Sequence, residues 1–420
     1  MKKLLTVTFF TGLLTLFRMG TGFLVSKIIA VQAGPSGLAL LAQIQNLATV
    51  LNGVVGASSS IALVRYTSEN ISGGYKQCTP WWRASLKCTL FLLAIFVPLG
   101  VIFSNYIAVW LFSDVSYSTY IRIICCLLPF SVLGTALNSV INGQQFYKKY
   151  ILLGGVSVSI ATLIMISMIY LYGIKGALAA ASVQLGIIGI VSLLICIKEP
   201  WVRIKFWLGK TTKNHVNGII GYMAMALISV ISMPLSLMAI RYSMAKHLGW
   251  DITGEWQLVW KISEVYLSVL TISLSTYYLP RLSKLKTYDD ILKEVNKTAF
   301  FIFPVVVFLA VLVYFSRDLI INLLFSSQFE NARDLFLVQL SGDVIKIIGW
   351  LYAYPMIATG AKKWFIGSEL FFCSTLFILS YIFMLKYGAQ GVNLGYLVNY
   401  VFYILFVLLN LKNILPKNHI

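Results

Sequence analysis

A segment that is long and apolar enough to cross a membrane carries two charged side chains, Lys261 and Glu264. A charge near the middle of the hydrocarbon costs roughly 2.5–3.5 kcal/mol on insertion scales, so such residues are usually kept for a function. The polar residues of this segment recur every three or four positions and therefore share one face of a helix. They are Gln257, Lys261, Glu264, Ser268, Thr271 and Ser275. The pattern predicts a helix that lines a hydrated cavity.

Three other apolar segments carry polar rows with the same rhythm, and each row predicts one wet helix face. They are Gln45, Thr49, Asn52, Gly56 and Ser59 in 38–64, Ser131, Thr135, Asn138 and Asn142 in 119–143, and Gln339, Asp343, Lys346 and Trp350 in 334–359. Trp260 and Trp350 lie on these helices and could stack on sugar rings. Serine, threonine, asparagine and glutamine also join membrane helices to one another, so a purely structural role stays open.

Basic residues outnumber acidic ones inside the predicted spans. The basic residues are Arg18, Lys27, Arg122, Arg241, Lys261 and Lys346, and the acidic residues are Glu264, Asp343 and Glu369. This surplus of positive charge predicts a cavity that binds an anion, for which a phosphate is the natural candidate. The three carboxylates are candidates for coupling to an ion gradient. Alternatively, Lys261 pairs with Glu264 and Asp343 with Lys346, while cations near the helix ends extend to the membrane surface.

The composition places these helices in a membrane. Hydrophobic residues make up 59% of the 420 residues and charged residues only 11%, which excludes a soluble domain. Apolar runs of membrane-spanning length predict an all-α integral membrane protein with twelve spans. These are 4–31, 38–64, 84–110, 119–143, 150–172, 176–197, 216–245, 255–280, 297–316, 334–359, 364–386 and 391–412.

The net charge of +19 comes mostly from one side of the predicted membrane. With the N-terminus inside, most lysines and arginines fall in cytoplasmic loops, so both termini are predicted to be cytoplasmic. This topology and attraction to anionic lipid explain the basicity without a nucleic acid partner. The six cysteines show no C-x-x-C spacing and the three histidines are scattered, so no metal or other cofactor is predicted.

Short motifs recur at an interval of about 215 residues, which indicates an internal repeat. The stretch 172–178, YGIKGAL, recurs at 387–393 as YGAQGVN, and 146–150, FYKKY, recurs at 360–364 as GAKKW. We therefore predict an N-terminal lobe, 1–205, and a C-terminal lobe, 206–420. Six spans in each half make the repeats parallel, as in transporters that bind near the membrane midplane and alternate access by rocking.

Three function classes fit a membrane protein of this kind. A lipid-linked substrate transporter and a small-molecule secondary transporter, such as a drug or sugar exporter, are both compatible with the repeat. Drug export would favour an acidic cavity over a basic one. An enzyme is the weakest candidate, because a polysaccharide polymerase or ligase needs a larger outer loop. The acidic pair in YDD, at 288–290, follows Thr287 and predicts a helix cap rather than a metal site.

Three stretches resemble the O-antigen flippases, the Wzx type of lipid-linked oligosaccharide flippase in the multidrug/oligosaccharidyl-lipid/polysaccharide exporter superfamily. They are FLVSKIIAVQAGPSGLALLAQIQNL, GEWQLVWKISEVYLSVLTISLSTYYLPRLSKL and RDLFLVQLSGDVIKIIGWLYAYPMIA. The resemblance covers nearly the whole chain. It implies twelve helices in two lobes that form a V, and transport of an undecaprenyl-diphosphate-linked oligosaccharide between leaflets of the bacterial inner membrane.

The resemblance also assigns roles to residues. Family members hold the diphosphate with basic residues in a central cavity, and Arg18, Lys27, Arg241 and Lys261 match that pattern by position, with Arg65 a weaker match. The sequence departs from the members that carry lipid III at Glu264, where an aspartate is expected. This favours an O-antigen unit as substrate. An O-antigen polymerase and a chain-length regulator are candidate protein partners, beside the membrane lipid itself.

Overall fold

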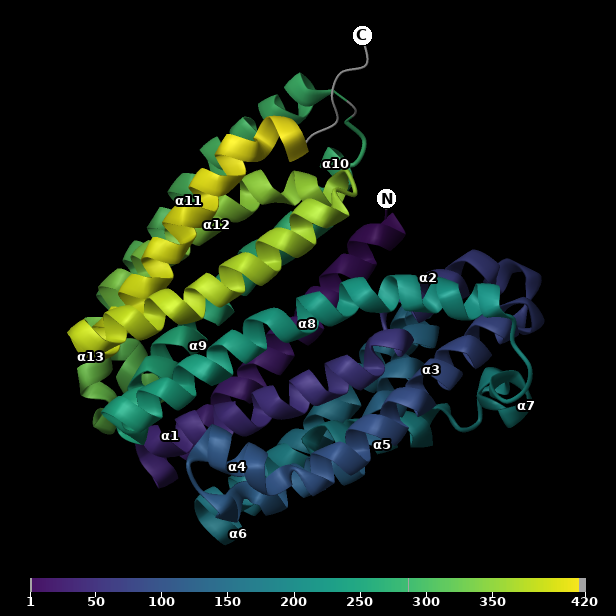
Figure 1. Ribbon diagram of the computed structural model, residues 1–420, viewed down its shortest axis with the longest axis horizontal. Helices are drawn as coiled ribbons and strands as arrows, with labels where there is room; N and C mark the ends of the chain where they lie inside the picture. The colour runs from purple at the N-terminus through teal and green to yellow at the C-terminus, as the bar shows by residue number, and fades with distance from the viewer. Residues whose placement is uncertain (1, 286, 415–420) are drawn as a thin grey trace. The chain divides into compact units, whose positions relative to one another are not determined.

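A computed structural model describes residues 2–285 and 287–414, and helices account for nearly all of them (Figure 1). No strand occurs among these residues, so the predicted all-α class is confirmed. The helices are α1 Lys2–Gly56, α2 Ile61–Asn70, α3 Tyr75–Ile102, α4 Ser104–Phe112, α5 Ser118–Gly143, α6 Tyr147–Cys196, α7 Ile204–Trp207, α8 Lys213–Leu248, α9 Trp250–Ser273, α10 Leu279–Leu282, α11 Tyr288–Leu324, α12 Phe336–Ala358 and α13 Lys362–Ile414.

Eight helical stretches of the described chain are long and apolar enough to cross a membrane. Three long helices, α1, α6 and α13, each contain one glycine with non-helical backbone angles: Gly34, Gly173 and Gly388. These breaks fall between neighbouring predicted spans, so each long helix supplies two of them. The predicted span 255–280 corresponds to α9, whose row of polar residues lowers its hydropathy. The helices therefore follow the predicted twelve spans.

The backbone repeats itself at the interval of about 215 residues that the motifs indicate. Six of the nine described residues with positive φ form pairs at this spacing: Gly34 with Gly249, Gln145 with Gly360, and Gly173 with Gly388. Glycine is the usual residue at such positions because it has no Cβ to clash. The helix α5 ends at Gly143 and α12 ends at Ala358, and the long helices α6 and α13 begin at Tyr147 and Lys362.

Hydrogen bonds at these two junctions also correspond one to one. After α5, three amides donate back to the last turn of the helix, and after α12 three amides at equivalent positions do the same. The pairs are Gln144 N to Val140 O and Thr359 N to Pro355 O, Gln145 N to Asn142 O and Gly360 N to Ile357 O, and Phe146 N to Ile141 O and Ala361 N to Met356 O. A residue of α5 or α6 can therefore be matched to its equivalent in α12 or α13.

The chain divides into two compact units. The N-terminal unit contains the chain up to Gln32 and Leu40–Met238, and the C-terminal unit contains Ala33–Ala39 and the chain from Ala239 onward. The division falls inside α8, whereas the repeat places a boundary between residues 205 and 206; that boundary remains a proposal. In the N-terminal unit α5 packs along α6 and α3, and in the C-terminal unit α12 packs along α13 and α11.

Buried aromatic residues hold each unit together at one end of its helices. In the N-terminal unit, Trp82 of α3 donates its indole N–H to Thr67 and stacks on Trp207 of the segment that connects the repeats. In the C-terminal unit, Tyr278 donates its hydroxyl to the carbonyl of Leu351 on α12. Because buried Trp and Tyr need a hydrogen-bond partner, these contacts fix the helices that carry the polar rows.

Candidate functional site

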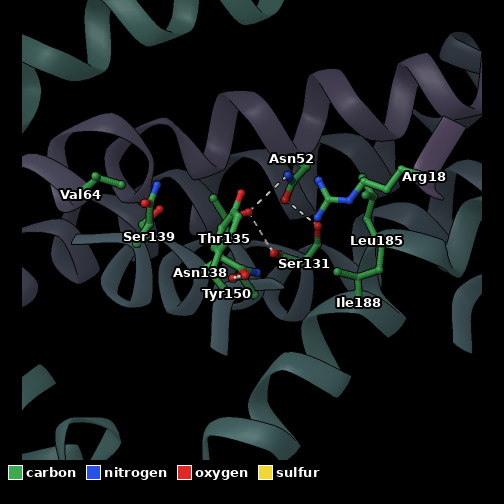
Figure 2. Close-up of a pocket in the computed structure, with 12 residues that line it drawn as sticks. Arg18, Asn52, Val64, Ser131, Thr135, Asn138, Ser139, Tyr150, Leu185 and Ile188 are labelled. Atoms are coloured by element: carbon green, nitrogen blue, oxygen red, sulfur yellow. Dashed lines mark hydrogen bonds between the residues drawn. The ribbon is translucent and has the colours of Figure 1, made fainter. Parts of the chain in front are cut away.

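A polar pocket of about 280 Å³ lies within the N-terminal unit (Figure 2). It brings together two of the predicted polar rows, the one that holds Asn52 in α1 and the one in α5. Its lining residues are Arg18, Asn52, Val64, Ser131, Gly134, Thr135, Asn138, Ser139, Asn142, Tyr150, Leu185 and Ile188. None of these twelve is acidic, so the lining carries one positive charge among neutral hydrogen-bonding groups.

Asn52 connects α1 to α5 at the centre of this polar pocket. Its amide Nδ2 donates to Thr135 Oγ1 over 3.5 Å, and its Oδ1 accepts a hydrogen bond from the Ser131 hydroxyl over 2.5 Å. One turn further along α5, the Asn138 amide donates to the carbonyl of Gly134 at 2.9 Å. The network keeps polar groups facing the pocket while the apolar residues of α5 pack against α6.

Arg18 is exposed and extends its guanidinium toward Asn52 and Ser131, as Figure 2 shows. Guanidinium presents a rigid fork of N–H donors that matches phosphate oxygens. Amides and hydroxyls, which both donate and accept, match the hydroxyl groups of a sugar. The arrangement is therefore suited to bind an anion joined to a sugar. Two residues that the sequence analysis singled out for different reasons, Arg18 and Asn52, are brought together here.

A second polar centre, in the C-terminal unit, encloses Lys346 of α12. Four aromatic rings from α9, α12 and α13 surround its ammonium, and we call this group the lysine cage. The distances from Nζ to the ring centroids are 4.8 Å to Trp350, 5.4 Å to Tyr400, 5.5 Å to Tyr396 and 5.6 Å to Trp260. Aromatic faces attract a cation within about 6 Å, and most strongly when water is excluded. Lys346 is only 7% exposed.

Asp343 lies one turn from Lys346 and has no exposed surface. Its carboxylate accepts hydrogen bonds from the Tyr266 and Tyr396 hydroxyls, both at 2.7 Å, and from Gln339 Nε2 at 3.3 Å. Tyr396 thus contacts both charged residues, because its hydroxyl donates to Asp343 and its ring faces Lys346. The predicted row of α12 is therefore joined to α9 and α13 through tyrosines that the sequence analysis missed. Their recurrence every three or four residues, at 396, 400 and 403, was the available signal.

Beside the lysine cage lies a smaller cavity of about 230 Å³, which we call the acidic pocket. Its lining residues are Trp350, Ala353, Tyr354, Met356, Ile357, Phe365, Glu369 and Tyr403. Glu369 is the one charged residue among these eight, and its Oε1 accepts a weak hydrogen bond from the Cys373 thiol at 3.8 Å. Glu369 and Trp350, predicted for different roles, thus line one cavity.

The other predicted site residues lie elsewhere. Arg241 is 2% exposed and donates its Nε–H to Gln257 Oε1 at 2.6 Å, so these two are paired inside the C-terminal unit. Glu264 is exposed and accepts the Trp260 indole N–H at 2.8 Å. Lys27 and Lys261 are both half-buried. The side chain of Ser275 lies outside the described residues.

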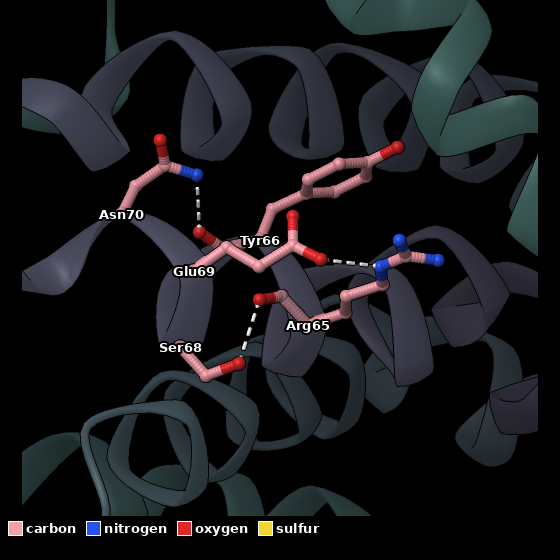
Figure 3. A network of polar contacts seen from close by, with 5 residues as sticks. All are labelled: Arg65, Tyr66, Ser68, Glu69 and Asn70. Atoms are coloured by element: carbon pink, nitrogen blue, oxygen red, sulfur yellow. Dashed lines mark hydrogen bonds and ion pairs between the residues drawn. The ribbon is translucent and has the colours of Figure 1, made fainter.

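Arg65, the weaker candidate, lies in α2 (Figure 3). Its Nε is 2.6 Å from Glu69 Oε1 one turn along the helix, and its guanidinium stands 4.9 Å from the Tyr222 ring centroid. Both partners of the ion pair are about half exposed, at 51% and 47%. In the C-terminal unit the capping prediction is confirmed, because Thr287 Oγ1 accepts the backbone N–H of Asp290 at the start of α11.

Comparisons with known proteins support the resemblance seen in the sequence. No family model matches the chain. It is 28% identical over 409 residues, 96% of both chains, to the lipid III flippases of Escherichia coli (strain K12) and Shigella flexneri. The predicted resemblance to lipid-linked oligosaccharide flippases is thus confirmed. These relatives are named as flippases, which supports the prediction that the chain is not an enzyme.

Solved structures show the same fold. An inward-facing multidrug resistance MATE family transporter of the MOP superfamily matches with a TM-score of 0.81 and 11% identity, over 93% of this chain and 94% of that one. The lipid II flippase MurJ, in an inward closed conformation, matches with a TM-score of 0.73 and 17% identity, over 96% and 87%. The multi-pass, twelve-helix transporter fold is therefore established.

Proposed function

We propose that the protein is a flippase for an undecaprenyl-diphosphate-linked oligosaccharide, and that its substrate is an O-antigen unit or a related glycan. The polar pocket of the N-terminal unit is the observation that carries this proposal. It offers the exposed guanidinium of Arg18 together with amides and hydroxyls, and no carboxylate among its lining residues. The relatives named as lipid III and lipid II flippases act on lipid-linked substrates, which supports the same substrate class.

In this mechanism the diphosphate binds Arg18 first, because a charged and bidentate hydrogen bond is stronger than a neutral one. The sugar next to the diphosphate meets Asn52, Asn138 and the Thr135 hydroxyl. The polyprenyl tail stays in the surrounding lipid, where its apolar surface costs nothing to solvate. The two repeats then alternate access between the leaflets, as parallel-repeat transporters do.

Further parts of the proposal rest on the sequence pattern and the resemblance. The remaining candidates for the cationic site are Lys27, Arg241, Lys261 and Lys346, and the candidates for ion coupling are Glu264, Asp343 and Glu369. Transport runs from the cytoplasmic to the periplasmic leaflet of the inner membrane, with both termini in the cytoplasm. An O-antigen polymerase and a chain-length regulator act on the product.

The test is transport of a short-chain polyprenyl-diphosphate glycan by the full-length protein in liposomes, followed by a lectin added outside. We expect the wild-type protein to make the glycan accessible to the lectin, and Arg18→Ala to reduce the rate at least about tenfold, the equivalent of about 1.4 kcal/mol. Arg18→Lys keeps the charge without the fork and is expected to fall between them.

Arg122→Ala is the matched control. Arg122 is also an exposed arginine of the N-terminal unit, but it donates to Ser104 and Asn105 and does not line the polar pocket. Full transport by Arg18→Ala would overturn the assignment of the site. Failure of the wild-type protein to move the glycan, with export of small molecules from the same liposomes, would replace the flippase proposal with the small-molecule transporter.

A further inference from the structure

The polar pocket and the acidic pocket occupy equivalent places in the two repeats. At the interval of about 215 residues, six lining residues of one match six lining residues of the other. The pairs are Thr135 and Trp350, Asn138 and Ala353, Ser139 and Tyr354, Asn142 and Ile357, Tyr150 and Phe365, and Ile188 and Tyr403. The shared backbone builds a cavity at this place twice, and the side chains decide what each cavity holds.

The charged group of each pocket comes from a different source. In the acidic pocket it is Glu369, which belongs to α13 itself. The equivalent residue of α6 is Gly154, which has no side chain and is buried. A Cβ added to Gly154 would lie 2.9 Å from Arg18 Nη2 and 2.7 Å from Leu14 Cδ2. The guanidinium of Arg18 thus fills the space in which the other repeat carries the beginning of a glutamate side chain.

We propose that Gly154 is the residue that makes the polar pocket selective for anions. Its missing side chain lets the Arg18 guanidinium lie against α6 beside Asn52 and Ser131, where it gives the pocket a positive charge. A glutamate at this position would place a carboxylate against the guanidinium and cancel that charge. This inference rests on the proposed function and assigns Gly154 as a positioning residue, one that acts through Arg18.

The contacts around Gly154 make the proposal testable without unfolding the protein. Both atoms that a Cβ would meet are the far ends of flexible side chains, so Leu14 and Arg18 can move while the helices stay in place. The adjacent Gly155 provides a matched control, because a Cβ there meets no atom within 4 Å. Gly154→Gln adds nearly the same volume as Gly154→Glu but no charge, so the two separate size from charge.

The experiment measures KM and kcat for the short-chain polyprenyl-diphosphate glycan in liposomes that contain each full-length variant. We expect Gly154→Glu to raise KM about tenfold, which corresponds to loss of one charge-assisted interaction. The expected rise is about twofold to threefold for Gly154→Gln, and no change for Gly155→Ala. A double-mutant cycle with Arg18→Gln then asks whether Gly154→Glu acts through the guanidinium. In that background we expect no further rise in KM.

A wild-type KM for Gly154→Glu, or a full additional rise in the Arg18→Gln background, would overturn the role of Gly154. To keep this failure distinct from failure of the flippase proposal, binding of the same lipid to detergent-solubilised protein is measured by fluorescence. Binding that weakens in Gly154→Glu and not in Gly155→Ala would support the inference even if the wild-type protein transported nothing. Equal binding by all variants would overturn it.

Discussion

The polar pocket and the lysine cage use the same backbone in opposite ways. Two pairs of equivalent positions show this. Thr135 lines the polar pocket and its equivalent, Trp350, forms part of the lysine cage; Leu185 lines the polar pocket and its equivalent, Tyr400, faces the ammonium of Lys346. Small polar side chains line a cavity of about 280 Å³ in the N-terminal unit, and mostly aromatic and apolar side chains line the equivalent cavity of about 230 Å³ in the C-terminal unit. A polar row on a membrane helix therefore indicates that one face is polar. The side chains packed opposite that face determine whether water reaches it.

The same contrast applies to the charges. Arg18 is exposed at the polar pocket, whereas Lys346 is 7% exposed and Asp343 has no exposed surface. A buried charge is stable only while its partners remain, because an unpaired charge in a dry environment is strongly unfavourable. We therefore expect substitutions in the cage to reduce stability, and substitutions in the polar pocket to reduce transport with little effect on stability.

The largest expected effect is that of Lys346→Ala. Removing the ammonium leaves the Asp343 carboxylate buried without a nearby positive charge and opens a cavity between Trp260, Trp350 and Tyr400. A buried charge left without compensation is strongly unfavourable, so we expect a strong fall in the thermal unfolding midpoint of the detergent-solubilised protein. Arg18→Ala, measured in parallel, should change the midpoint little.

A double variant separates charge from packing in that result. Lys346→Met keeps an apolar stem inside the rings, and Asp343→Asn removes the carboxylate charge while it keeps the hydrogen-bonding shape. The double variant should lose less stability than the sum of the losses of the two single variants, because it leaves no uncompensated buried charge. If Lys346→Ala unfolds at the wild-type temperature and loses transport instead, the cage is part of the binding site, as the sequence first suggested, and the contrast fails.

The sequence predicted the helices and the polar rows well, because both depend on local periodicity. The repeat was also visible, since the positive-φ glycines at 173 and 388 lie inside the two matched motifs. The enclosure of Lys346 could not be predicted in this way. It depends on Tyr396 and Tyr400, whose helical spacing indicates a shared face, but only tertiary packing shows that this face meets α12 and Lys346.

Gly154 shows a second limit of sequence reasoning. A glycine in an apolar helix has no periodic signal, and its importance lies in the atoms that would collide with a side chain. Charged residues attract attention in a sequence, so Glu369 was singled out and its equivalent was not. Comparing the two repeats position by position, once their backbones are aligned, recovers the missing information.

An intermediate effect is expected for Asn52→Ala, which tests whether the polar pocket depends on its network. Both amide atoms of Asn52 are engaged, by the Ser131 and Thr135 hydroxyls. Loss of a partly buried hydrogen-bond pair costs about 1–3 kcal/mol at most sites, and water in the pocket can replace part of it. We expect a fall of a few degrees in the unfolding midpoint and a rise in KM that is smaller than that of Arg18→Ala. A larger effect on stability than Lys346→Ala would reverse the comparison.

The smallest expected effect concerns the backbone that the two repeats share. At the junction after α5 the left-handed position holds Gln145, with φ of 57°, and at the equivalent junction after α12 it holds Gly360, with φ of 72°. A residue with a Cβ costs roughly 1–2 kcal/mol in this conformation. Gly360→Ala should therefore destabilise the protein by about 1 kcal/mol, even though its Cβ would meet no atom within 4 Å. Gln145→Gly should stabilise it by a smaller amount, since the added freedom of the unfolded chain offsets part of the relief. Chemical denaturation in mild detergent measures the stability of both variants.

Opposite signs for the two changes in stability would show that the junctions are the same structure with different sequences. Destabilisation by both substitutions would mean that the Gln145 side chain makes a contribution of its own to the N-terminal unit.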